Sequence, residues 1–248
     1  IWSKILEAEK LDPKTRISAG GADKNWWSRS GTPDKMPIGE IGGPDTEVYY
    51  RFDELRHNEK CTEDKPISCE CGKYLEIANS VFMQYQKTEN GFVELPQKNV
   101  DYGGGLERLL AAVENKNDIF QTSIFASTIK AIEKETGKSY KEYAKKMQII
   151  ADHLGGSVFI SNANIKPSNK EQGYILRRLL RRALDNFYAL EGKDISPIIY
   201  KIVELYKGTD PYLEKNFEEI KLTILEEEAN YKRTLATAKQ FISKKYPS

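Results

Sequence analysis

The apolar and polar positions divide the chain into two parts of different texture. In the first part, short runs rich in β-branched and aromatic residues predict strands at 45–52, 74–87 and 92–100, followed by a helix near 105–116. From residue 118 onward the apolar residues recur at i, i+3 and i+4, which is typical of amphipathic helices. These helices are expected at 120–136, 139–154, 173–192, 195–206 and 211–245. The pattern therefore predicts an α+β module over residues 1–118 and an all-helical domain over residues 119–248.

Composition and charge exclude several classes of protein. The 248 residues carry a net charge of +1, so any site for an anion must be local rather than a property of the whole surface. No apolar run approaches the roughly 18 residues of a membrane span, and no secretory signal is present. Three clustered cysteines, an odd number, favour a reducing compartment over a disulfide framework. We expect a cytoplasmic protein with no membrane partner.

The stretch VDYGGGLERLL, residues 100–110, combines a carboxylate, three glycines and an arginine at the start of a helix. Asp101 precedes the glycines Gly103, Gly104 and Gly105, which let a ligand approach the backbone because no Cβ intervenes. Arg108 lies one turn into the helix. This combination suits a ligand that carries both an ammonium group and phosphates. The alternative is a plain strand-to-helix turn with a surface Glu-Arg pair, because short glycine-rich motifs recur by chance.

The segment GYILRRLLRRAL, residues 173–184, places aliphatic residues on one half of a helix and four arginines on the other. Like charges at this spacing repel each other unless an anion neutralises them. Arginine suits bidentate contacts with phosphate. Pairing with acidic residues of neighbouring helices is the alternative. The four are Arg177, Arg178, Arg181 and Arg182. Asn169, in the preceding polar loop, is either a helix cap or an amide that reads a base edge.

A polar segment, residues 53–72, contains one histidine and all three cysteines. Thiolate and imidazole groups suit tetrahedral zinc, so His57, Cys61, Cys69 and Cys71 are candidate ligands of a structural zinc ion that clamps a hairpin. The alternative is three reduced surface thiols, since the spacing H-x3-C-x7-C-x-C is not a common zinc-finger pattern.

Two further groups of residues are candidates for a ligand site. Trp27, in KNWWSRSG, is expected in a loop, where a tryptophan either plugs a domain edge or forms a flat apolar wall for a small ligand. Glu76 and Asn79 are polar residues in an otherwise apolar strand. Buried polar groups need hydrogen-bond partners, so a neighbouring strand or a ligand must supply them.

Four motifs, in the same order and at similar spacings, resemble those of bacterial-type alanyl-tRNA synthetase, a class II aminoacyl-tRNA synthetase. They are YLEIANSVFMQYQK, VDYGGGLERLL, IIADH and PSNKEQGYILRRLLRRA, and KNWWSRSG and GPDTEVYY resemble the segment upstream. The resemblance implies a class II antiparallel sheet with flanking helices, followed by a helical tRNA-recognition domain. It also implies an alanine–tRNA ligase, which uses ATP with Mg to form alanyl-adenylate and then charges tRNA(Ala).

The resemblance assigns roles to residues of the first module. Asp101 would pair with the α-ammonium group of alanine, Gly103 would keep the floor of the pocket low, and Trp27 and Val81 would line the pocket for the methyl group. Arg108, with Gly105, would hold ATP, and Asp101 and Arg108 would be the catalytic pair. The positions of Glu47, Glu76 and Asn79 correspond to residues that shape the family's active site.

In the helical domain, the resemblance assigns Asn169 to recognition of a G·U wobble pair in the tRNA acceptor stem. The arginines at 177, 178, 181 and 182 would contact the RNA backbone.

The sequence also departs from the family pattern. Motifs 1 and 2 of the class II family are not found, so we expect the N-terminal half of the catalytic domain to be a required partner and this piece alone to be inactive. The second determinant of G·U recognition is missing too. The histidines His57 and His153 lie too far apart for the family's HxxxH editing site. The rival hypothesis is therefore a catalytically silent synthetase-like module that binds tRNA or another RNA.

Overall fold

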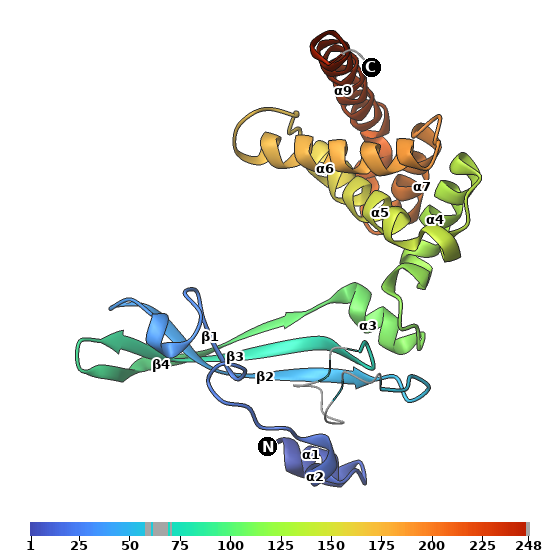
Figure 1. The fold of residues 1–248 in the computed structure, drawn as a ribbon. Helices are drawn as coiled ribbons and strands as arrows, with labels where there is room; N and C mark the ends of the chain where they lie inside the picture. Colours follow the sequence, from blue (N-terminus) through green and yellow to red (C-terminus); the bar gives the residue numbers. More distant parts are fainter. Residues whose placement is uncertain (58–60, 62–68, 70, 247–248) are drawn as a thin grey trace. The chain divides into compact units, whose positions relative to one another are not determined.

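The computed structural model of the chain describes residues 1–57, 61, 69 and 71–246. It consists of two compact units, Ile1–Ile119 and Phe120–Ser248. The first contains an antiparallel sheet of four strands with short helices, and the second is built from packed helices (Figure 1). The predicted α+β class, with an antiparallel sheet followed by helices, is confirmed. Within the described residues, no helix is long and apolar enough to cross a membrane.

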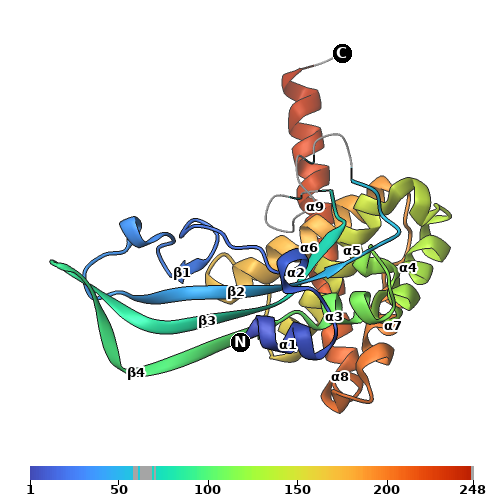
Figure 2. The same cartoon turned by 90° about the horizontal axis from the view of Figure 1, so that it is seen from below.

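The sheet of the first unit has the strand order β1-β2-β3-β4, so each strand pairs with its neighbour in sequence. Long strands β2, β3 and β4 run side by side, and short β1 covers one end of β2 (Figure 2). The strands are β1 (Trp26–Ser28), β2 (Ile41–Arg51), β3 (Tyr74–Thr88) and β4 (Gly91–Gly104). The helices of this unit are α1 (Trp2–Ala8), α2 (Pro13–Arg16), the 3-10 turn η1 (Pro33–Lys35) and α3 (Leu106–Val113).

Two sequence predictions about this sheet were wrong. The tryptophan pair, expected in a loop, forms β1, because Trp26 and Trp27 pair with Pro44 and Gly43 of β2. The stacking of Trp26 on Tyr85, with ring centroids 5.9 Å apart, adds apolar contact to that pairing. Gly103 and Gly104, expected in a turn, continue β4, because the backbone of β3 offers them ladder partners.

The second unit consists of helices that bury one continuous apolar core. Its elements are η3 (Ile119–Gln121), α4 (Ser123–Thr136), α5 (Tyr140–Asn162), α6 (Glu171–Ala189), α7 (Ser196–Tyr206), α8 (Pro211–Lys215) and α9 (Phe217–Lys245). On α6, the spacing of Leu176, Leu180 and Leu184 places all three side chains in the core. The last expected helix is interrupted at Asn216, which separates α8 from α9. Because these three leucines of α6 face the core, the arginines of α6 lie on the opposite side of the helix.

Candidate functional site

Three strands of the sheet bring polar residues from distant segments onto one face. Asp45 of β2 pairs with Val81 of β3, which pairs with Asp101 of β4. Two residues further along each strand, Glu47 of β2 pairs with Asn79 of β3, which pairs with Gly103 of β4. Cross-strand partners share a face, and so do residues two apart on one strand. The sequence candidates Val81, Asn79, Asp101, Gly103 and Glu47 therefore lie together, and Asp45 joins them.

Hydrogen bonds hold the carboxylate of Glu47 at the centre of this face. The Tyr49 hydroxyl donates to Glu47 Oε2, and Asn79 Nδ2 donates to Glu47 Oε1 at 3.4 Å. Burial, together with this hydrogen bond, raises the pKa of Tyr49 above its ordinary range, so the hydroxyl stays protonated and keeps donating. Tyr49 was not among the residues singled out from the sequence.

Two buried oxygen atoms on the same face, Asp45 Oδ1 and Asn79 Oδ1, have no hydrogen-bond partner among the described residues. Burial raises the pKa of the Asp45 carboxyl, and the nearby charge of Glu47 raises it further. A buried acceptor without a donor is costly. Both oxygens are therefore available to a ligand that supplies N–H groups or a positive charge.

Asp101 and Gly103 lie at the open side of this face. The side chain of Asp101 is exposed, whereas its cross-strand neighbour Val81 is buried. A Cβ added at Gly103 would meet no atom within 4 Å. Packing within the chain therefore does not require glycine there, and the space above Gly103 is free for a ligand.

Arg108 borders the face from the first turn of α3. Gly105 is the N-cap residue of this helix, and its backbone N–H donates to Ile77 O at 3.2 Å, which ties the helix start to β3. The Nη1 atom of Arg108 donates to Glu76 O at 3.1 Å and lies 3.3 Å from Glu76 Oε2. Because both side chains are more than a third exposed, this ion pair contributes little to stability. Arg108 can therefore exchange Glu76 for an anionic ligand at low cost.

Trp27 is less closely associated with this face than the sequence suggested. It pairs with Gly43, and the register between β2 and β3 shifts between Gly42 and Asp45, which separates Trp27 from the row of Val81. Its side chain is 42% exposed.

A cavity of about 480 Å³ lies between the N-terminal segment and β2, and it reaches Glu47 and Tyr49 from the outer edge of the strand. Trp2 and Ile17 contribute to its opposite wall. Trp2 Nε1 donates to Thr46 Oγ1 at 3.2 Å, which ties α1 to β2. The cavity is of a size that accepts a small molecule, and Asp101 and Val81 are outside its lining.

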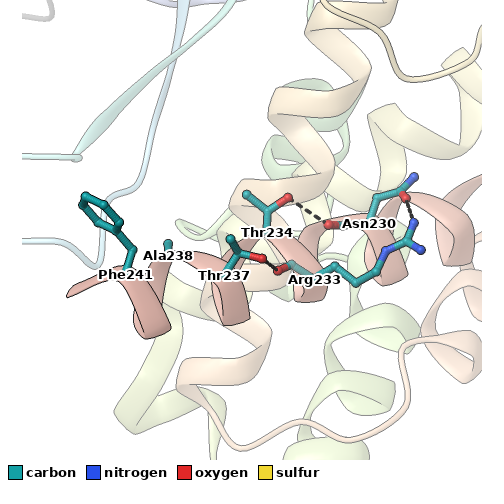
Figure 3. A pocket seen from close by; sticks show the side chains of 6 residues that line it. All are labelled: Asn230, Arg233, Thr234, Thr237, Ala238 and Phe241. Carbon is teal, nitrogen blue, oxygen red and sulfur yellow. Dashed lines mark hydrogen bonds between the residues drawn. The ribbon is translucent and has the colours of Figure 1, made fainter. Parts of the chain in front are cut away.

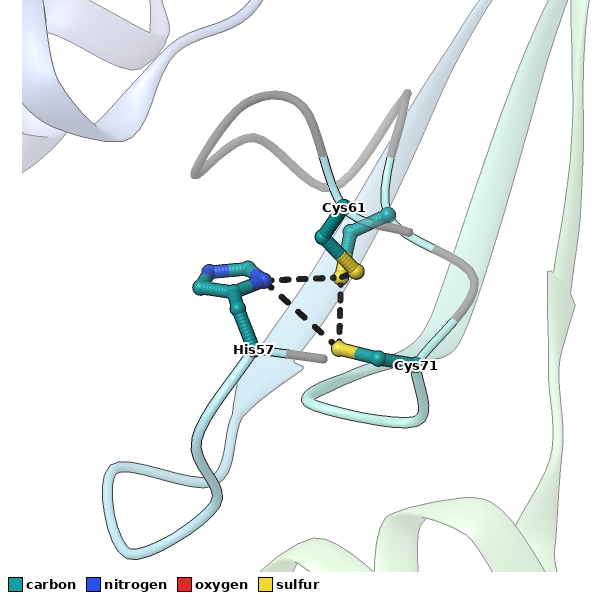
Figure 4. Close-up of side chains that lie close together, drawn as sticks. His57, Cys61 and Cys71 are labelled. Atoms are coloured by element: carbon teal, nitrogen blue, oxygen red, sulfur yellow. Dashed lines mark hydrogen bonds between the residues drawn. The ribbon is translucent and has the colours of Figure 1, made fainter. Parts of the chain in front are cut away.

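The four candidate metal ligands of the first unit form a tight cluster (Figure 4). One ligand atom from each of His57, Cys61, Cys69 and Cys71 lies within 4.8 Å of all the others. Cys69 Sγ is 3.8 Å from Cys61 Sγ, 2.9 Å from Cys71 Sγ and 3.4 Å from His57 Nδ1. In a tetrahedral zinc site, metal–ligand bonds of about 2.0–2.3 Å place the ligand atoms roughly 3.5–3.8 Å apart. The donor set and most of these spacings fit zinc.

The thiols of this cluster differ in acidity. The pKa of Cys71 is lowered to about 6, because its sulfur accepts hydrogen bonds from Cys69 and from the Lys73 backbone. The pKa of Cys69 is raised to about 11 by burial and by its hydrogen bond to Cys71. The cluster therefore already favours one thiolate, the form that binds metal.

The four arginines of α6 in the second unit fall into two pairs. Arg181 Nε donates to Glu227 Oε1 at 2.8 Å, and Arg177 Nε lies 3.6 Å from the same oxygen. Glu227, on α9, is only 3% exposed. Arg178 and Arg182 are exposed, and neither forms an ion pair with any other described residue. Two arginines thus share one internal carboxylate, which neutralises part of their charge, and two remain available to an external anion.

Asn169 lies exposed in the loop before α6, and its side-chain oxygen accepts a hydrogen bond from Arg177. This contact joins the two candidate RNA-binding groups, the loop and the arginine face.

A hollow on the surface of α9 carries no comparable constellation. Its lining comes from this helix alone, and its hydrogen bonds link residues three or four positions apart, as from Thr234 Oγ1 to Asn230 O at 2.9 Å (Figure 3). It is a helix surface, and we assign it no role.

Comparison with known proteins gives the family of the chain. The family model described as "tRNA synthetases class II (A)" matches residues 1–248. The chain belongs to this class II tRNA synthetase family. Curated relatives named alanine–tRNA ligase include that of Borrelia hermsii, 37% identical over 240 residues, with 92% of this chain and 38% of the relative covered. That of Fusobacterium nucleatum is 34% identical, with 98% of this chain and 29% of the relative covered. The chain thus spans less than half of these relatives.

Sequence reasoning missed three residues of this synthetase chain that the structure brings into its sites. Asp45 and Tyr49 lie two residues before and after Glu47 on β2, and this spacing predicts a shared face of the strand but not which residues of other strands lie beside it. Glu227 belongs to the acidic run EEE at 226–228. The only signal in the sequence was its place on the apolar side of a helix. A carboxylate buried there requires a cationic partner.

Proposed function

We propose that the chain forms part of an alanine–tRNA ligase, in which residues 1–118 hold alanine and ATP and residues 119–248 contact tRNA(Ala). The observation that carries the proposal is the alignment of Asp101, Gly103 and Val81 on one face of the sheet, bordered by Arg108. The names of the relatives supply the overall reaction, the ligation of alanine to tRNA, and the resemblance of the motifs adds that alanine and ATP first form alanyl-adenylate.

In this proposal, the exposed carboxylate of Asp101 pairs with the α-ammonium group of alanine. The buried side chain of Val81, next to Asp101 on β3, meets the methyl group. The open space above Gly103 leaves room for the substrate backbone. Trp27 on β1 is assigned a more distant place at the edge of the methyl pocket, because the register shift in β2 separates it from the row of Val81. Such a pocket excludes larger side chains by steric clash, but it discriminates poorly against glycine, because one methylene is worth only about 1–3 kcal/mol.

Arg108, with the backbone at Gly105, holds the phosphates of ATP. Its weak pairing with Glu76 keeps the guanidinium in place without neutralising it permanently. A fixed positive charge at this point stabilises the charge that develops when the alanine carboxylate attacks the α-phosphate. The carboxylates Asp45 and Glu47 on the same face are oxygen ligands of the kind that suit Mg²⁺ bound with ATP.

The test is alanine-dependent exchange of pyrophosphate with ATP. Because the chain covers less than half of its relatives, we would join it to the segment that precedes the matched region in the Borrelia hermsii enzyme. The joined protein is expected to catalyse exchange, and Asp101→Asn should lower kcat/KM for alanine by about 100-fold or more, through loss of the charged pair. Asp23→Asn, at an exposed site away from the sheet face, is the matched control. Exchange that is unchanged in Asp101→Asn would refute the assignment.

For tRNA, the proposal assigns the exposed Arg178 and Arg182 to the phosphate backbone and Asn169 to the G·U pair of the acceptor stem. Arg177 and Arg181 contribute less directly, because Glu227 already neutralises part of their charge. Affinity for an acceptor-stem duplex should fall steeply with salt. Arg178→Ala and Arg182→Ala should each reduce the salt slope by about one. Equal slopes in these variants and the parent chain would exclude phosphate contact by this face.

The cluster of His57, Cys61, Cys69 and Cys71 is proposed to bind one structural zinc ion that clamps the β2–β3 connection. The donor set leaves no ligand position open, as expected for a structural site rather than a catalytic one. Metal analysis of protein purified under reducing conditions should give one zinc per chain. Cys69→Ser should abolish it, because Cys69 is near all three other ligands. Full zinc content in that variant would contradict the assignment.

A second function, an RNA-binding module without catalysis, is favoured by one observation: the helical unit is compact by itself and carries its own exposed arginines. It predicts salt-dependent RNA binding, together with the absence of exchange activity in the joined protein described above.

A further inference from the structure

The loop that carries Asn169 is joined through one arginine to a carboxylate buried at the contact of α6 and α9. Arg177 Nη1 donates to Asn169 Oδ1, and Arg177 Nη2 donates to Pro167 O at 3.3 Å. The Nε atom of the same guanidinium lies 3.6 Å from Glu227 Oε1. Glu227 is in turn held by Arg181. The inner side of the Arg177 guanidinium thus faces the Glu227 carboxylate at ion-pair distance, with Nε buried and without a hydrogen-bond partner among the described residues, and its outer side reaches the loop.

This contact determines which way the amide of Asn169 faces. A guanidinium has only donors, so the atom that faces Arg177 must be the amide oxygen. The amide nitrogen then lies on the far side of an exposed side chain, and Asn169 Nδ2 donates to no other described residue. Two N–H donors therefore face outward from the loop.

Apart from the contact of Arg177 with Pro167 O, the backbone of the loop is held by contacts that do not involve Arg177. Ser168 N donates to Gly173 O at 3.0 Å, and Ser168 Oγ donates to Lys170 O at 2.9 Å. Gly173 is packed so tightly that an added Cβ would lie 2.3 Å from Ser168 Oγ. Arg177 thus contributes mainly to the orientation of the Asn169 side chain, whereas Ser168 and Gly173 maintain the course of the loop.

We propose that Arg177 is a positioning residue for RNA recognition, which orients the amide of Asn169 so that its NH₂ group meets an acceptor on a base edge. The inference rests on the proposed tRNA contact of Asn169 and adds how its donor group is oriented. The minor-groove edges of base pairs present acceptors, and the minor groove of an A-form RNA helix is wide and shallow enough to be reached. An amide free to rotate would present its oxygen to the base as often as its nitrogen. The amide oxygen and the base acceptor would then repel each other.

The test compares binding of the 248-residue chain to two acceptor-stem duplexes that differ only in one base pair, G·U or G·C. The measured quantity is the ratio of the two affinities. Arg177→Met should lower this ratio about three- to tenfold, the cost of orienting one free side chain on binding. Its affinity for the G·C duplex should change much less. Asn169→Asp should lose the preference completely, because the carboxylate still accepts from Arg177 but offers no outward donor.

Arg178→Met is the matched control, since it removes an exposed arginine from the same helix. It should weaken binding to both duplexes equally and leave the ratio unchanged. Nuclear magnetic resonance distinguishes a positioning role of Arg177 from a role in maintaining the loop backbone. In Arg177→Met the backbone amide signals of Ser168 and Gly173 should stay in place while the side-chain NH₂ signals of Asn169 shift. If Arg177→Met unfolds the helix, Arg177→Lys carries the test, because one ammonium group cannot replace the contacts to Glu227, Pro167 and Asn169 together.

Failure of this inference is distinct from failure of the proposed function. If Asn169→Ala loses the preference for the G·U duplex but Arg177→Met and Arg177→Lys keep it, the positioning role is refuted and the tRNA contact stands. If the parent chain shows no preference, or Asn169→Ala does not alter it, both the tRNA contact and the positioning role are refuted.

Discussion

The buried carboxylate of Glu227 on α9 should stabilise the packing of α6 against α9, because it pairs with Arg177 and Arg181 of α6. Glu227 is 3% exposed and lies 2.8 Å from Arg181 Nε. Removing one partner of a fully buried ion pair costs about 3–5 kcal/mol, because the other charge is left without compensation. Two features reduce that cost here. Arg181 is 32% exposed, and Arg177 remains 3.6 Å from the same carboxylate. We therefore expect Arg181→Met to lower the free energy of unfolding by about 2 kcal/mol.

A double-mutant cycle separates this electrostatic effect from lost packing. When Glu227→Leu has already removed the carboxylate, Arg181→Met should cost less than about 0.5 kcal/mol, because no buried charge is left unpaired. Urea unfolding followed by far-ultraviolet circular dichroism reports mainly on the helical unit. Fluorescence provides an internal control, since all three tryptophans, Trp2, Trp26 and Trp27, lie in the first unit and their transition should not move.

Equal costs of Arg181→Met in both backgrounds would refute the reasoning. Such a result would assign the effect of Arg181 to its hydrocarbon stem and to its cation–π contact with Tyr231, whose ring centroid is 5.1 Å away. The carboxylate of Glu227 would then not be the group that holds Arg177 and Arg181 in place.

Three further predictions concern the first unit and can be followed by tryptophan fluorescence. Burial raises the pKa of Asp45, so the folded state is destabilised by the charged carboxylate at pH values above that raised pKa. Asp45→Asn removes this charge and should stabilise the unit near neutral pH. The gain should vanish as the pH falls below the ordinary pKa of 3.8, where Asp45 is protonated in both states. A pH-independent gain would contradict this origin. Gly43→Ala should destabilise the unit by about 2 kcal/mol or more, because its Cβ would lie 1.8 Å from Phe82 O; Gly103→Ala, the matched control, should stay within about 0.5 kcal/mol and impair only alanine activation. Arg108→Ala should change stability by less than about 1 kcal/mol, since its ion pair with Glu76 is exposed, yet it should abolish exchange in the joined protein; a large loss of stability would instead make Arg108 a structural residue.

The sequence by itself determined where most elements lie and which residue types the sites contain. Alternating and helical periodicities record how each segment is buried, so the long strands and most of the helices could be read without a structure. The cysteine cluster could also be anticipated, because three cysteines and one of only two histidines lie within 15 residues and form a donor set that suits zinc. The order of the motifs indicated the synthetase family.

Only the tertiary structure decided which of these residues meet. The strand register places Asp45, Val81 and Asp101 in one row. A shift of one residue would turn a strand's side chains to the other face, and the register shifts within β2 and β3 appear only when the strands are paired. The division of the α6 arginines depends on Glu227, which lies 46 residues beyond Arg181. A helical pattern gives the face of a side chain, whereas packing against another helix decides whether its charge is already compensated.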